Sequence, residues 1–110
     1  MIEKVYQITK RTTKTIERVI ADDHVHFMHM ILPKGEGLPI HLSNANLYMS
    51  VLKGTLAIDL NDQGIHYYEV GTILNIPLGI KMDVHNEKEE ILELFVIKTP
   101  VPGSTVNQKN

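Results

Sequence analysis

Histidine is the residue type through which this chain could carry out chemistry near neutral pH. The sequence has six histidines and no cysteine, so it offers neither a thiol nucleophile nor a disulfide framework. His24 and His26 are two residues apart, which puts them on one face of a strand, and His41 follows a segment punctuated by glycine and proline. Imidazole nitrogens can bind a divalent metal or accept a proton, so these three residues are the first candidates for a site.

Strands are expected to position these histidines. Short segments rich in β-branched residues alternate between apolar and polar positions, and glycine, proline, asparagine and aspartate separate them. No segment predicts a helix longer than about two turns, so the pattern indicates an all-β sandwich or barrel. The expected strands are residues 4–8, 15–20, 24–32, 47–52, 55–60, 65–70, 72–76, 81–85 and 91–98.

The segment 24–32 carries apolar residues on both faces, which is typical of a strand inside a sandwich or barrel. The sequence leaves open which face points inward. We expect His24 and His29 at the surface or at an interface, and His26 in the core with a hydrogen bond to the backbone. One face carries His24, His26, Met28, Met30 and Leu32, and the other carries Val25, Phe27, His29 and Ile31.

Length and composition predict one domain over residues 1–110, with a core at about 15–98 and a tail at 99–110. Apolar residues make up 43% of the chain and charged residues 22%, with a net charge of -2. Without a basic cluster we expect no nucleic-acid or membrane partner. The start of the chain lacks an apolar signal segment, so we expect a soluble, cytoplasmic protein.

Two segments bounded by glycines resemble the two motifs of the cupin family. The first motif has the spacing Gly…His-x-His…Glu…Gly. The chain follows this spacing with Gly35, five residues, His41, Leu42, Ser43, three residues, Leu47, six residues and Gly54. The spacing of the second motif is followed by Gly71, Pro77, Gly79, Met82 and Asn86. Met82 stands at the position where this motif has a histidine. Together the two segments cover Gly35 to Asn86, about half of the chain.

The resemblance implies a small single-domain cupin of the cupin 2 type, a double-stranded β-helix or jelly-roll-like barrel that forms a homodimer. A typical cupin holds a metal with three histidines and one glutamate, and of these only His41 is present here. We therefore predict no metal at the consensus positions and no cofactor. The pocket residues would be His41, Ser43, Leu47, Met49, Met82 and His26, although the apolar ones among them could simply fill the barrel.

Two classes of function stay open. The first is a protein that binds a small molecule without the usual cupin metal. The alternative is a cupin enzyme, an isomerase, lyase or dioxygenase-like protein, in which His41 acts as a general base or joins His26 and His24 in a rebuilt site for a divalent metal.

Overall fold

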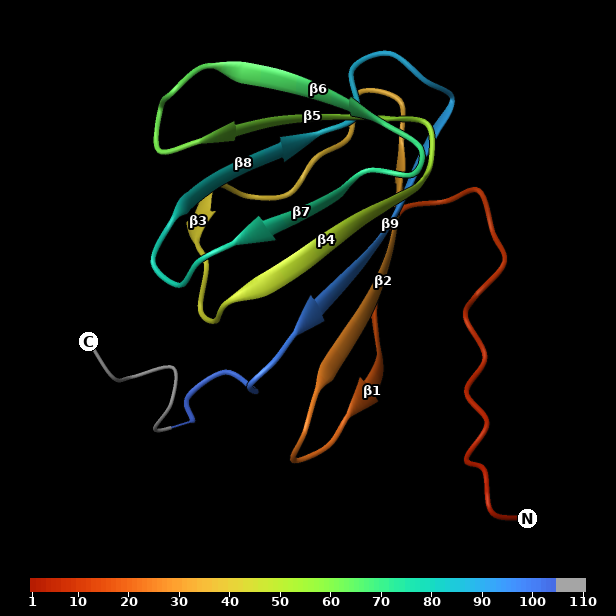
Figure 1. Ribbon diagram of the computed structural model, residues 1–110. Coiled ribbons are helices and arrows are strands. Elements are labelled where there is room, and N and C mark those ends of the chain that lie inside the picture. Colours follow the sequence, from red (N-terminus) through yellow and green to blue (C-terminus); the bar gives the residue numbers. More distant parts are fainter. Residues whose placement is uncertain (105–110) are drawn as a thin grey trace.

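The computed structural model describes residues 1–104, and these form nine strands in two antiparallel sheets with no helix (Figure 1). The five-stranded sheet has the order β1-β2-β9-β4-β7, and the four-stranded sheet has the order β3-β8-β5-β6. The strands are β1 (Thr15–Ala21), β2 (His26–Pro33), β3 (His41–Leu42), β4 (Leu47–Lys53), β5 (Thr55–Leu60), β6 (Ile65–Glu69), β7 (Ile73–Ile76), β8 (Lys81–His85) and β9 (Ile91–Lys98).

The two sheets enclose one apolar core, which we call the interior of the barrel. Because side chains alternate along a strand, every second residue of β2, β4 and β9 faces this interior. In β2 the inward face is that of Met28, Met30 and Leu32, which settles the question that the sequence left open. The core residues that are less than 2% exposed are Leu32, Leu47, Met49, Val51, Leu56, Ile58, Ile76, Val84, Leu92 and Leu94.

Most strand predictions are confirmed. The hairpin of β5 and β6 turns through Asn61 and Asp62, whose φ angles are 52° and 58°, a conformation that asparagine and aspartate tolerate better than other non-glycine residues. The predicted strand at residues 4–8 is wrong: this segment pairs with no strand among the described residues, and residues 1–7 are exposed. The segment that leads to His41 forms only the two-residue strand β3.

The strands span residues 15 to 98, and the predicted tail at 99–110 lies partly outside the described residues. No helix among the described residues is long and apolar enough to cross a membrane.

Candidate functional site

His41 lies on the edge strand β3, directly opposite Met82 of β8. Residues directly opposite in an antiparallel pair point to the same side of the sheet, and Met82 is a core residue, so His41 is on the interior side. His41 is nevertheless exposed, because β3 is the edge strand of its sheet. The Nδ1 of His41 donates to the Pro39 carbonyl oxygen at 2.7 Å, so in the neutral form of the ring the lone pair is on Nε2.

Ser43 is buried and its hydroxyl is fully engaged by the backbone. Its Oγ donates to the Pro77 carbonyl oxygen at 2.6 Å and accepts from the Ile80 amide at 2.8 Å. The Ser43 backbone adds two hydrogen bonds to Ile80 and Gly79. Ser43 therefore fixes the 77–80 loop against the end of β3, which leaves its hydroxyl little capacity for a ligand.

Leu47, Met49 and Met82 lie in the core with exposed fractions of 1%, 1% and 3%. They form an apolar layer beneath His41, with His41 and Met82 in direct register. Their side chains fill the barrel, which is one of the two alternatives that the sequence left open. Whether they also contact a ligand stays a prediction.

His26 is half-buried at the start of β2 and opposes Lys98 of β9, which in turn opposes Leu47 of β4. This row faces the interior, because Leu47 is a core residue. His24 precedes β2 and is exposed in the turn after β1, where its backbone amide donates to Asp22 Oδ1 at 2.8 Å. Within residues 1–104 no three His, Asp or Glu side chains are placed to hold a metal ion.

Lys98 is a site candidate that the sequence analysis missed. Its Nζ donates to Asn44 Oδ1 at 2.9 Å, which ties the end of β9 to the loop just after His41. Figure 1 shows β3, the start of β4 and the end of β9 on the same side of the barrel. We call this region, defined by His26, His41 and Lys98, the barrel end. Its signal in the sequence was the alternation Leu94, Val96, Lys98, which places a lysine on the inward face.

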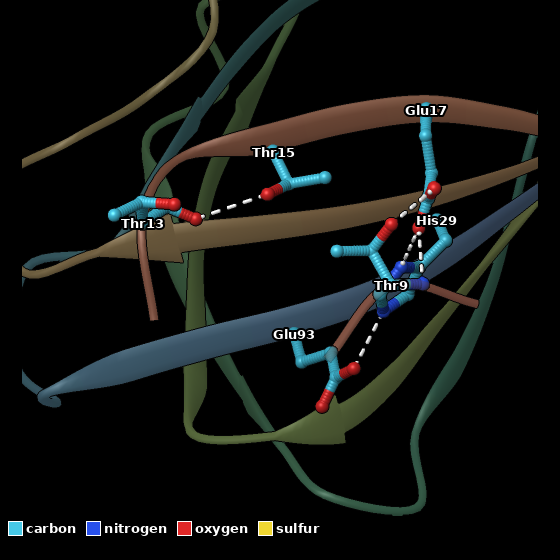
Figure 2. Close-up of polar contacts among 6 residues, drawn as sticks. All are labelled: Thr9, Thr13, Thr15, Glu17, His29 and Glu93. Atoms are coloured by element: carbon cyan, nitrogen blue, oxygen red, sulfur yellow. Dashed lines mark hydrogen bonds and ion pairs between the residues drawn. The ribbon is translucent and has the colours of Figure 1, made fainter. Parts of the chain in front are cut away.

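A second cluster lies on the outer face of the five-stranded sheet (Figure 2). His29, which is 0% exposed, places Nδ1 2.7 Å from Glu17 Oε2 and Nε2 2.5 Å from Glu93 Oε2. Ionised carboxylates only accept hydrogen bonds, so both contacts are hydrogen bonds to ionised carboxylates when each ring nitrogen of His29 carries a proton. The expectation that His29 lies at the surface is wrong.

The N-terminal segment explains this burial. Thr9 donates from its backbone amide to Glu17 Oε2 at 2.9 Å and from its hydroxyl to Oε1 at 2.7 Å. The ring of Phe95 packs at 5.8 Å from the ring of His29. Figure 2 shows Thr9 beside the His29 ring. This segment and the Phe95 ring together cover a histidine that the strand alternation alone would have left facing solvent.

Glu17 makes the stability of the folded protein depend on pH in the acidic range. The hydrogen bond from His29, followed by those from Thr9, lowers the pKa of Glu17 from 4.5 to about 2. A carboxyl group whose pKa falls on folding contributes stability that is complete above the unfolded value and is lost as the pH falls toward the folded one. We expect the urea midpoint to drop between pH 5 and pH 2, and to drop less steeply in Glu17→Gln. Equal slopes for the two proteins would contradict this.

Two cavities of about 350 and 340 Å³ lie away from the barrel end. One is lined by Gly54, Thr55, Glu69, Val70 and Glu89, and the other by Thr9, Lys10, Arg11, Thr12, Ile31 and Glu93. The predicted site residues line neither, so a ligand held by His41 would sit at the exposed barrel end above a filled interior.

Comparison with known proteins places this geometry in a family. The chain is 40% identical over 103 residues to the uncharacterized protein MJ0764 of Methanocaldococcus jannaschii, covering 93% of this chain and 89% of that protein. The crystal structure of that protein, described as an RmlC-like cupin family protein with a double-stranded β-helix fold, matches with a TM-score of 0.88 at 40% identity over 91% of this chain and 93% of the other.

More distant structures share the fold alone. A cupin superfamily protein of Desulfitobacterium hafniense matches with a TM-score of 0.71 at 13% identity, covering 84% of this chain and 83% of the other. No protein-family model matches the chain. The relationship to the Methanocaldococcus protein, together with the two-sheet barrel and the motif spacing around His41, shows that the chain belongs to the cupin family.

Proposed function

We propose that this cupin binds a small molecule at the barrel end without the usual cupin metal. The observation that carries the proposal is the His41 side chain, which is on the interior side and is exposed. Its Nδ1 is held by the Pro39 carbonyl, and its Nε2 makes no hydrogen bond to any residue of 1–104. A ring fixed in this way offers one directed acceptor beside an apolar layer, the combination found in small-molecule sites.

The side chains at the consensus positions support the metal-free part of the proposal. Leu47 has no donor atom for a metal, and Ser43 uses its hydroxyl on the backbone. Met82 is a thioether, a soft ligand that suits copper(I) and not the divalent metals of the family, and it is packed in the core.

His41→Ala is expected to reduce the retention of a small molecule while leaving the fold intact. Loss of one hydrogen bond of about 0.5–1.5 kcal/mol would lower affinity roughly 2- to 10-fold. Native mass spectrometry of untagged protein would measure the retained molecule, and elemental analysis would measure metal. We expect metal well below one atom per chain in the parent protein.

His66→Ala is the matched control. His66 is also exposed and also donates from Nδ1 to the carbonyl oxygen two residues earlier, at 3.0 Å, but it lies on β6. Equal retention by His41→Ala and the parent would contradict the proposal. About one metal per chain, lost on His41→Ala, would instead support the enzyme alternative with a rebuilt metal site.

A further inference from the structure

The outer face of the five-stranded sheet carries two neighbouring rows of mostly apolar side chains. Residues directly opposite in antiparallel strands point to the same side, and these rows alternate along β2, β9 and β4 with the residues of the core. One row runs across β1, β2, β9 and β4, and the next runs from β2 to β7. The apolar members of the two rows, which we call the outer patch, are Ile20, Phe27, Tyr48, Ile73, Phe95 and Ile97.

The outer patch has the composition of a protein interface. Aromatic and branched apolar side chains make it up, and none of its members is charged, as is typical of the centre of an interface. The rings of Phe27 and Phe95 pack edge to face at 4.8 Å. Tyr48 and Ile73 are 39% and 66% exposed, so a partner that covers them would remove apolar surface from water.

The N-terminal segment, residues 1–8, is a second apolar feature without cover. Its residues 4–8 alternate as a strand does, yet they pair with no strand among residues 1–104. Val5 and Tyr6 are 61% and 46% exposed, and in Figure 1 the N-terminal end of the chain lies away from both sheets. The hydrogen bonds from Thr9 to Glu17 hold the base of the segment at the edge strand β1. The segment therefore begins beside the outer patch without covering it.

Charge favours a second copy of this chain as the partner. The charged residues of 1–14 give a net charge of +3, and they are Glu3, Lys4, Lys10, Arg11 and Lys14. The whole chain has a net charge of -2, so residues 15–110 carry -5. A basic segment is attracted to an acidic barrel, and a second copy supplies both. Two uncharged patches can also face each other without repulsion between like charges.

We propose that the outer patch is an interface with a second copy of this chain, and that the N-terminal segment of each copy lies against the barrel of the other. In a two-fold arrangement the same patch serves on both sides and each contact occurs twice. The inference goes beyond the binding of a small molecule at the barrel end and does not depend on it, because His41 belongs to the other sheet.

Tyr48→Glu and Ile73→Lys test the outer patch. Each variant places a charge where the interface would bury it, and an unpaired buried charge is costly. Sedimentation at micromolar concentration should give twice the chain mass of 12.5 kDa for the parent and the mass of one chain for both variants. A circular-dichroism spectrum of β-sheet type would show that each variant is folded, and if one of them unfolds the other decides.

Ile65→Lys is the matched control for these variants. Ile65 is an isoleucine with 49% exposure, but it lies on β6 of the four-stranded sheet. We expect this variant to sediment at the mass of two chains, as the parent does. A one-chain mass for Ile65→Lys would place the interface elsewhere and overturn the proposal.

The exchange of segments is tested on the full chain by NMR. In a mixture of isotope-labelled and unlabelled chains, an isotope-filtered spectrum should show contacts between the Val5 methyl groups of one copy and the other copy. Contacts of Val5 within its own chain alone would overturn the exchange. A parent protein with the mass of one chain, or Tyr48→Glu and Ile73→Lys proteins that stay dimeric, would overturn the interface itself.

Discussion

Replacing His29 with alanine is expected to lower the free energy of unfolding by about 2–4 kcal/mol, because removal of one partner from a buried ionic cluster leaves the others without compensation. The two carboxylates that flank His29 are about one quarter exposed, so water can partly replace the ring, and we place the cost below that of a fully buried pair. Urea denaturation at pH 7 would measure it.

His24→Ala is the control for this experiment. His24 is an exposed histidine in the turn before β2, and its loss should change stability by less than about 0.5 kcal/mol. A correlation spectrum of the imidazole nitrogens at pH 7 gives an independent reading, in which His29 should show protons on both ring nitrogens. An unchanged urea midpoint for His29→Ala, or a His29 ring with one proton, would contradict this ionic cluster.

Gly54→Ala is expected to destabilise the barrel by at least about 2–4 kcal/mol, because two separate costs add. The φ angle of Gly54 is 82°, which strains any side chain, and a Cβ at this position would lie 2.3 Å from the Ile91 carbonyl oxygen. The contact is with backbone at the start of β9, so relief would require strand β9 to move away from the β4–β5 connection.

Gly79→Ala separates strain from steric conflict. Its φ angle is 83°, nearly that of Gly54, but a Cβ there meets no atom within 4 Å. We expect a cost of about 1–2 kcal/mol for this control from the left-handed conformation alone. Thermal denaturation of both variants would test the difference, and a Gly54→Ala protein as stable as Gly79→Ala would show that β9 shifts without penalty.

The fold could be predicted largely from local sequence. Alternation identified the strands that contribute to the core, and the glycine spacing of the two motifs identified the cupin barrel. The exceptions have local causes as well. β3 is two residues long, too short to show a period, and residues 4–8 have a strand-like pattern but no neighbouring strand to pair with. A pattern can indicate a strand without supplying its partner.

The site was less predictable because its contacts join distant residues. The motif spacing identified His41 and its interior side, but the partners of His29 are 12 and 64 residues away in the chain. The position of Lys98 beside His26 and Leu47 depends on the register of three strands. Single-sequence patterns carry no information on such register. The homodimer stays a prediction.

The position of β9 has a consequence for the order in which the chain can fold. The last strand lies between β2 and β4, so the five-stranded sheet has its final piece at its centre. During synthesis β1 and β2 can form a hairpin, and Glu17 can meet His29 early, but Glu93 is not yet available. The five-stranded sheet and the contact of Glu93 with His29 can therefore form only after residue 98 has left the ribosome. Until then the edges of β2 and β4 are open to pairing with other chains.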